Sequence, residues 1–229
     1  MADWSKSFSD KKYIALIPQP EAYYFIKAME NLFGTNPLDI WDLCCGAGRH
    51  TVLISKMGHR AYGSDFSENA VEHARKWLED EGLNAELAVA GMTEQPWGSI
   101  RFHAVIAWDA LHHDTLDRIK KTVGIVYDSL TNGGAFMVSL LSTKDRAYKK
   151  GLEIEENTFI WEDGAEAGVP RHYFDESAIR SLFAKWELIS LVEYAATYVQ
   201  REPDYFKPNP FPDTKWGVIA KKRGVRITH

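Results

Sequence analysis

The chain has 229 residues, of which 45% are hydrophobic and 26% are charged, a composition typical of a globular domain that can bury a core. Its formal net charge of −5 argues against a protein that binds nucleic acid through a basic surface. No segment approaches the roughly 18 apolar residues of a membrane span, and the beginning of the sequence lacks the apolar segment of a signal peptide. We therefore expect a cytoplasmic protein with neither nucleic-acid nor membrane partners, present as a monomer or a homodimer.

Helices and strands alternate along most of the chain. Hydrophobic periodicity and capping residues predict, in chain order, a helix over 18–34, a strand over 38–43, a helix over 49–57, a strand over 60–65, a helix over 67–82, strands over 84–91 and 103–109, a helix over 114–130, a strand over 133–141, a helix over 175–186, and strands over 187–199 and 215–223. Ser67 and Asp175 are the expected N-caps of their helices.

This order predicts an α/β fold with a doubly wound, mostly parallel seven-stranded sheet that ends in an antiparallel hairpin. The hairpin is expected because the last two strands, which flank a proline-rich loop over 201–213, follow each other without a helix between them. We expect a single domain over 1–229. In it, residues 1–36 would form an N-terminal helical arm and lid, and the polar insertion 142–172 would form a cap over the substrate.

The stretch DLCCGAGRH, residues 42–50, joins the first predicted strand to a helix. Its Gly46-x-Gly48 step lets the backbone approach a ligand, and the helix start beyond it favours negatively charged groups. Thr51 stands where an NAD-binding fingerprint requires its third glycine, and no Gly-Lys-Ser/Thr triplet of a phosphate-binding loop is present. Both of these nucleotide motifs are therefore disfavoured, and a plain tight turn is the alternative.

Cys44 and Cys45 are the two cysteines of the chain, and they are adjacent. They are poorly placed to bridge each other, and neither a C-x-x-C spacing nor a second cluster of metal ligands accompanies them. We interpret them as packing residues in a reduced protein and expect no bound metal.

Candidate ligand-binding residues follow the other predicted strands of the sheet. Asp65 ends the second strand, where a carboxylate can accept both hydroxyls of a ribose, although it could instead cap the next helix. Met92, after the third strand, could lie against an adenine ring or simply fill the core. The end of the fourth strand contributes three pocket candidates, Asp109, His112 and His113.

Five stretches in this order resemble the class I S-adenosylmethionine (SAM)-dependent methyltransferases: DLCCGAGRH, GSDFSENAVEHAR, AGMTEQPW, FHAVIAWDALHH and LTNGGAFMVSLLS. The resemblance covers residues 38–142, and GRH together with FDESAIRSLFAKWELISL is most similar to the small tellurite-resistance-type methyltransferases. It implies SAM as the cofactor and S-adenosylhomocysteine (SAH) as its product. It implies cofactor contacts at Asp42, Cys44, Gly46, Gly48, Arg49, Asp65, Phe66, Ser67, Gly91, Met92, Thr93, Asp109 and Ala110.

The resemblance also implies roles for individual positions. Asp42 would lie near the amino group of SAM, Asp65 would bind the ribose and Phe66 would border the adenine. Asp109 would lie near the sulfonium. Cys44 replaces the glycine that is commoner in the family; because a residue at a strand end need not have a positive φ, we expect little effect.

Methyl transfer from a sulfonium is an in-line displacement in which the protein aligns the reactants and excludes water. A base is needed only where the acceptor is a hydroxyl or an ammonium. The catalytic candidates are His113, His112 and Asp109, and packing against the next helix is the alternative for the histidines. The substrate candidates are Tyr13, His172 and Tyr173.

The sequence thus predicts SAM-dependent methyl transfer to a small-molecule acceptor whose O, N, S or metalloid nucleophile is open. The alternatives are a non-catalytic module that binds SAM or a nucleotide, a methyltransferase with a protein substrate, and a nucleotide-dependent oxidoreductase, which Thr51 disfavours.

Overall fold

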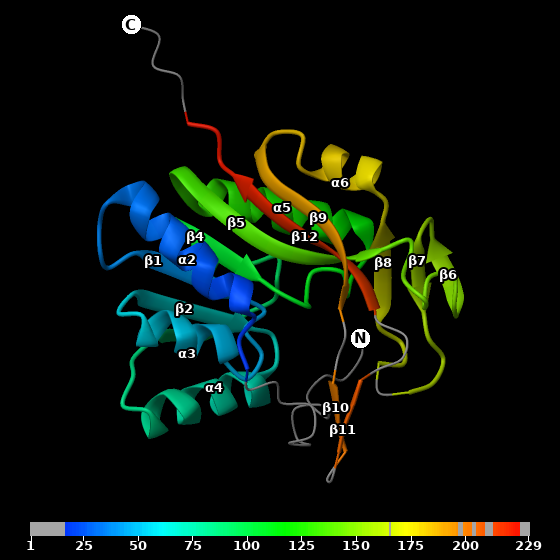
Figure 1. Ribbon diagram of the computed structural model, residues 1–229, viewed down its shortest axis with the longest axis horizontal. Helices are drawn as coiled ribbons and strands as arrows, with labels where there is room; N and C mark the ends of the chain where they lie inside the picture. Colours follow the sequence, from blue (N-terminus) through cyan, green and yellow to red (C-terminus); the bar gives the residue numbers. More distant parts are fainter. Residues whose placement is uncertain (1–16, 165, 197–198, 203–204, 209–212, 225–229) are drawn as a thin grey trace, which may run out of the picture.

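The computed structural model describes residues 17–164, 166–196, 199–202, 205–208 and 213–224. A ten-stranded sheet lies at its centre (Figure 1). Parallel strands follow one another in the order β3, β2, β1, β4, β5; β12 then pairs antiparallel with β5, and β9 pairs antiparallel with β12. The bounds are β1 Asp39–Leu43, β2 Arg60–Asp65, β3 Glu86–Val89, β4 Phe102–Ala107, β5 Leu130–Ser142, β9 Glu187–Ala196 and β12 Asp213–Lys221. These strands confirm the predicted fold class, a mostly parallel sheet with an antiparallel hairpin at one end.

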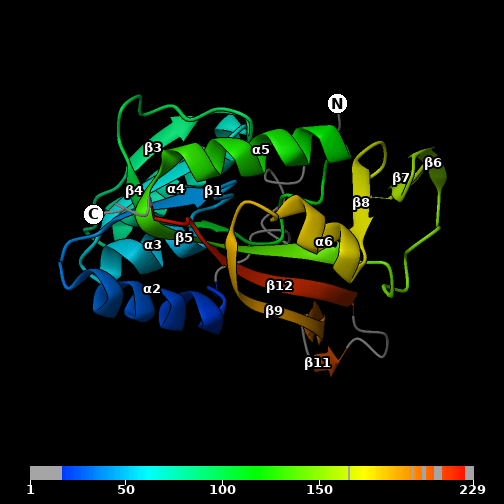
Figure 2. The same ribbon diagram turned by 90° about the horizontal axis from the view of Figure 1, so that it is seen from above.

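Helices cover both faces of the sheet. Figure 2 shows α5 and α6 on one side and α2 and α3 on the other, while α4 packs on β2 and β3 beside α3. The bounds are α2 Pro20–Phe33, α3 Arg49–Lys56, α4 Glu68–Asp80, α5 Leu116–Ser129 and α6 Glu176–Leu182. Among the described residues, no helix has the length and apolarity needed to cross a membrane.

The two helical layers enclose two hydrophobic clusters, one on each face of the sheet. In β4, Val105 and Ala107 belong to the cluster under α5 and α6, whereas Ala104 and Ile106 belong to the cluster under α2 and α3. Both sets are completely buried. A strand covered on both faces needs apolar residues at every position, which explains its continuous hydrophobic run.

The predicted helix caps are confirmed. The hydroxyl of Ser67 accepts a hydrogen bond from the backbone N–H of Ala70, and the carboxylate of Asp175 accepts one from Ala178. Each cap satisfies a backbone donor that the first turn of a helix leaves without an intrahelical partner.

Two segments differ from the prediction. The insertion 142–172, for which no helix or strand was predicted, contains β6 Leu152–Glu155, β7 Thr158–Ile160 and the beginning of β8 Pro170–Phe174. β8 joins the end of β5 through the pairs Leu141–Tyr173 and Ser142–Phe174. The expected loop 201–213 instead contributes to a separate hairpin of β10 Val199–Glu202 and β11 Tyr205–Pro208. These strands are three to five residues long, too short for a hydrophobic alternation to emerge from the sequence.

Candidate functional site

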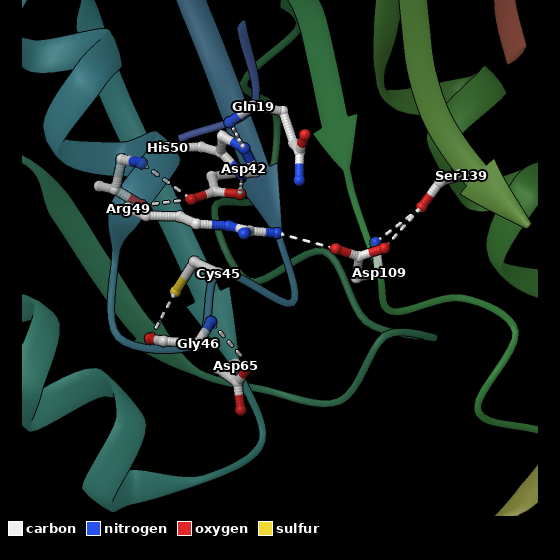
Figure 3. A network of polar contacts seen from close by, with 10 residues as sticks. Gln19, Asp42, Cys45, Gly46, Arg49, His50, Asp65, Asp109 and Ser139 are labelled. Carbon is white, nitrogen blue, oxygen red and sulfur yellow. Dashed lines mark hydrogen bonds and ion pairs between the residues drawn. The ribbon is translucent and has the colours of Figure 1, made fainter. Parts of the chain in front are cut away.

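Three carboxylates gather at the carboxyl ends of neighbouring strands (Figure 3). Asp42 lies in β1, Asp65 ends β2 and Asp109 follows β4. Because β1 is the central partner of both β2 and β4 and all three run parallel, their carboxyl ends meet at one edge of the sheet. The predicted placement of these three residues around a common site is therefore present in the structure.

Asp42 is buried and bound by the first turn of α3. Its Oδ2 accepts hydrogen bonds from the backbone N–H of Thr51 at 2.9 Å and from the Thr51 hydroxyl at 2.7 Å. Burial raises the pKa of Asp42 to about 7, in spite of these hydrogen bonds and the nearby charge of Arg49. Thr51 therefore has a structural role, because its two hydrogen bonds hold the carboxylate of Asp42 in place.

His50 is a site residue that the sequence analysis missed. Its Nε2 accepts a hydrogen bond from the backbone N–H of Gln19 at 3.2 Å, and its Nδ1 lies 3.8 Å from Oδ1 of Asp42. Burial, aided by the charge of Arg49, lowers the pKa of His50 to about 3, so the ring is neutral and carries its proton on Nδ1, toward Asp42. His50 connects the segment before α2 to the site.

Asp65 is bound by two backbone groups. Its Oδ2 accepts from the N–H of Gly46 at 3.0 Å, and its Oδ1 accepts from the N–H of Ser67 at 2.9 Å. Burial raises the pKa of Asp65, against the effect of these hydrogen bonds. Asp65 therefore does support the following helix start, but a carboxylate has about four acceptor positions, which leaves capacity for ribose hydroxyls as well.

The turn after β1 corrects one expectation from the sequence. Cys44 has a φ of 57°, in the left-handed region, so the chain does require there the conformation that glycine adopts most easily. A non-glycine residue in this region costs about 1–2 kcal/mol, so the replacement of glycine is not neutral for the backbone. Burial raises the pKa of the Cys44 and Cys45 thiols, which disfavours the reactive thiolate form.

Gly48 serves helix packing. Its φ is 92°, and a Cβ added to it would lie 2.7 Å from Cβ of Ala74 in α4. The absence of a side chain at Gly48 therefore allows α3 to begin against α4.

Asp109 is held by two cations from distant parts of the chain. Nζ of Lys215 lies 2.6 Å from its Oδ1, and a guanidinium N–H of Arg49 donates to its Oδ2 at 3.1 Å. Its own backbone N–H donates to the hydroxyl of Ser139 at 2.8 Å. Burial opposes ionisation of Asp109, but the charges of Lys215 and Arg49 outweigh it and hold the pKa below its ordinary value. The sequence analysis missed Lys215 and Ser139, whose contacts with Asp109 join distant parts of the chain.

His112 and His113 lie next to each other, with ring centroids 4.3 Å apart. Burial lowers the pKa of both rings well below the ordinary value, with further contributions from the charges of Lys215 and Arg171, so both are neutral near pH 7. The backbone carbonyl of His112 accepts a hydrogen bond from the N–H of His172, which brings β8 to the end of β4.

The two substrate candidates on β8 are buried in the described structure. Nδ1 of His172 lies 2.6 Å from the hydroxyl of Thr158, and burial lowers the pKa of His172 to about 4. Tyr173 packs against Tyr148 and Phe159, and burial raises its pKa to about 12. Tyr13 lies outside the described residues.

The remaining predicted cofactor contacts border the same edge of the sheet. Phe66 is 49% exposed, directly after Asp65, which leaves an apolar face uncovered. Gly91, Met92, Thr93 and Ala110 are half-buried.

Within the described ranges, no group of three or more His, Cys, Asp or Glu side chains could hold a metal ion. A cavity of about 480 Å³ lies elsewhere, between α5 and α6, and none of the predicted site residues lines it.

The sheet order and the carboxylates at the carboxyl ends of β1, β2 and β4 are those expected from the resemblance to the class I SAM-dependent methyltransferases. Residues 40–134 match the methyltransferase domain family, in agreement with the class predicted from the sequence.

Comparison with individual proteins supports this assignment. An uncharacterized methyltransferase of Synechocystis is 32% identical over 111 residues, which are 47% of this chain and 49% of that protein, so the chain matches about half the length of this curated relative. A SAM-dependent methyltransferase from Methanosarcina mazei has a similar structure, with a TM-score of 0.72 at 17% identity over 91% of this chain and 99% of that one. The 1,6-didemethyltoxoflavin N1-methyltransferase of Burkholderia thailandensis, solved with its substrate and SAH, gives a TM-score of 0.62 at 16% identity, over 89% of this chain and 79% of that one.

The cofactor of this class is SAM, and the donor set of the site fits it. The carboxylate of Asp42 is suited to an ammonium group, Asp65 retains acceptor capacity for a ribose, and the exposed ring of Phe66 is suited to a base. These individual contacts remain predictions.

Proposed function

We propose that this chain is a SAM-dependent methyltransferase that acts on a small molecule at the carboxyl ends of β1, β2 and β4. The observation that carries the proposal is the convergence of Asp42, Asp65 and Asp109 at this edge within a methyltransferase domain. A small-molecule acceptor is supported by the similarity in fold to the toxoflavin enzyme.

The bound cofactor supplies a methyl group that is already activated on a sulfonium. The protein's part is therefore to bind, orient and exclude water. In this proposal Asp42 would pair with the ammonium group of the methionyl part of SAM, and Asp65 would accept hydrogen bonds from the ribose hydroxyls. The ring of Phe66 would cover the adenine. The tight hydrogen bonds of Asp42 and Asp65 to the backbone hold both carboxylates in position before the cofactor arrives.

The three candidate bases that the sequence predicts are weak. Asp109 is ionised and bound by two cations, while His112 and His113 are neutral with pKa values well below the ordinary range. A group with so low a proton affinity extracts a proton poorly from a neutral hydroxyl. We infer that the acceptor arrives as a nucleophile that needs no strong base, such as a thiolate, an uncharged amine or an oxyanion.

Binding of the cofactor tests the proposal directly. Calorimetric titration of the purified protein with SAM and SAH should give saturable binding, and Asp65→Asn should weaken it at least tenfold through lost ribose hydrogen bonds. Asn keeps an acceptor for one of the two backbone N–H groups that Asp65 binds, which makes it a milder change than alanine. Asp39→Asn, at the opposite end of β1, is the matched control and should bind as the wild type does. Absence of binding at high micromolar SAM would refute the proposal.

Turnover separates an enzyme from a binding module. The protein is incubated with SAM and a panel of thiols, phenols, amines and metalloid oxyanions, and SAH is measured by mass spectrometry. Formation of SAH that depends on one class of acceptor identifies the nucleophile. Tight binding without turnover on any acceptor would favour a non-catalytic SAM-binding module.

A further inference from the structure

Arg171 in β8 is a buried cation at the end of the sheet that carries the insertion (Figure 1). The residue is 8% exposed, and its guanidinium carbon lies 3.5 Å from the centroid of the Trp161 ring. Nη2 of Arg171 pairs with the carboxylate of Glu166, whose side chain is 31% exposed. A buried cation persists only where other groups compensate for the lost water, and here an aromatic ring and one carboxylate do so.

The guanidinium of Arg171 lies near the carboxyl end of β4. Its charge adds to burial in lowering the pKa of both His112 and His113, the two rings that follow this strand. The backbone N–H of His172, the next residue of β8, donates to the carbonyl of His112 at 2.9 Å. Arg171 therefore lies beside the edge of the sheet where the three carboxylates meet, on the side of the insertion.

Two buried donors in this cluster have no acceptor. Among the described residues, Nε of Arg171 and Nε1 of Trp161 are shielded from water and have no hydrogen-bond partner. Each of these atoms can only donate. A buried donor without a partner costs about 1–3 kcal/mol, so native proteins rarely retain one without a functional reason. Two such donors on residues in contact, one of them cationic, are complementary to a negatively charged group with two acceptor oxygens.

The carboxylates around Arg171 do not satisfy its Nε. Glu166 contacts a terminal nitrogen of the guanidinium, and the charges of Asp145 and Asp213 also act on Arg171. Asp145, however, accepts hydrogen bonds from two backbone N–H groups, and Asp213 pairs with Arg146. A ligand oxygen at Nε would therefore compete with no hydrogen bond that the described residues make.

We propose that Arg171 and Trp161 bind a carboxylate group of the methyl acceptor, which makes the acceptor a small organic acid. The planar fork of the guanidinium matches the planar carboxylate, and the indole N–H supplies a further donor. The carboxylate anchors the acceptor, while the nucleophile is a separate group of the same molecule. This inference rests on the proposed function and adds to it the chemical class of the acceptor.

Binding of acids and of their amides to the protein saturated with SAH provides the test. Benzoate, phenylacetate and 3-mercaptopropanoate are titrated by calorimetry beside benzamide, phenylacetamide and 3-mercaptopropanamide, in which an uncharged amide replaces the carboxylate. At least one acid should bind about 10- to 100-fold more tightly than its amide, the range expected for charge-assisted hydrogen bonds.

Variants of the two residues assign the effect. Arg171→Gln should reduce the ratio of acid to amide affinity to less than about threefold, and unchanged binding of SAH shows that the variant is folded. Arg171→Lys keeps the charge without the planar fork and should recover only part of the ratio. Trp161→Phe keeps an aromatic ring against the guanidinium but removes the N–H, so it should weaken acid binding about 3- to 10-fold. Arg180→Gln, which removes an exposed arginine of α6, is the control and should keep the wild-type ratio.

Kinetics give a second readout for any acid that the acceptor panel shows to be methylated. Arg171→Gln should raise KM for that acid about 10- to 100-fold and change kcat less than about threefold, because an anchoring contact is made equally in the ground state and the transition state. A loss of kcat at unchanged KM would contradict the anchoring role.

The remaining outcomes separate this inference from the proposed function. Equal affinity for every acid and its amide, an unchanged ratio in Arg171→Gln, or tighter binding of inorganic phosphate than of any acid would overturn the inference. Saturable binding of SAH in the same titrations would leave the proposed function standing. Failure of the wild type to bind SAH would overturn both.

Discussion

At the scale of single residues, the surroundings of a carboxylate decide its charge. Asp42 and Asp109 lie at the carboxyl ends of neighbouring strands, and their pKa values shift in opposite directions. Asp109 is ionised because Lys215 and Arg49 bind it directly, whereas Asp42 has mainly the hydrogen bonds of Thr51 against the cost of burial. Asp42 is therefore costly to keep in its ionised form, the form that an ammonium group requires.

Asp42→Asn is expected to stabilise the protein in a pH-dependent way. The pKa of Asp42 is about 7 in the folded protein, whereas the ordinary value of 3.8 applies to the unfolded chain. The folded state therefore retains a proton that the unfolded state loses as pH rises from about 4 to about 7. Stability contributed by the protonated carboxyl is lost over that interval, by roughly 3–5 kcal/mol for a shift of about three pKa units. Asparagine keeps an oxygen for Thr51 and does not titrate. Denaturant unfolding should show the variant more stable than the wild type at pH 8 and close to it at pH 4; an equal difference at both values would contradict the assigned pKa.

At the scale of elements, the glycine turn connects two helices as well as a strand and a helix. Gly48 lies against Ala74 of α4, and Thr51, three residues later, binds Asp42 of β1. The start of α3 is thus determined by close contacts with both neighbours. A Gly-x-Gly motif read only as space for a ligand misses this structural requirement.

Gly48→Ala should destabilise the protein more than an alanine at another left-handed glycine. At Gly48 the added methyl meets Ala74, whereas at Gly58, with a φ of 82°, nothing lies within 4 Å. Gly58→Ala should cost about 1 kcal/mol for backbone strain alone, and Gly48→Ala about 2–4 kcal/mol because overpacking adds to the strain. Denaturant unfolding of the two variants without cofactor measures the difference, and equal losses would show that α4 yields to the added group.

At the scale of the whole molecule, the sheet has a centre that is buried on both faces and an extension at one end that consists of β8, β7 and β6. β1, β4 and β5 are buried on both faces, whereas β6 is mostly exposed and β8 joins β5 through two residue pairs. Local opening is easiest where few buried contacts are lost. This extension coincides with the insertion that we expect to cap the substrate, so a low local stability there is compatible with opening for entry and release.

Hydrogen exchange should reveal this gradient. Backbone amides of β6 and β7 should exchange fastest among the described strands of the main sheet, and those of β1, β4 and β5 slowest, because only the latter require global unfolding. Peptide-level mass spectrometry of the native protein measures the order. Protection of β6 and β7 equal to that of β4 would show that the extension folds as one unit with the core.

The sequence by itself determined the features that depend on local patterns. The alternation of apolar strands and capped helices predicted the parallel sheet, and the parallel sheet implied that Asp42, Asp65 and Asp109 would meet at one edge. Ser67 and Asp175 were predictable as caps because a helix start needs a nearby acceptor.

Only the tertiary structure decided which partners those residues have. Lys215 reaches Asp109 across 106 positions of sequence, Gln19 reaches His50 across 31, and neither contact has a local signal. The left-handed conformation of Cys44 and the contact of Gly48 with Ala74 likewise arise from the way β1, α3 and α4 pack. Burial and long-range charge set the protonation of the site, and both exist only once distant segments exclude water from one another.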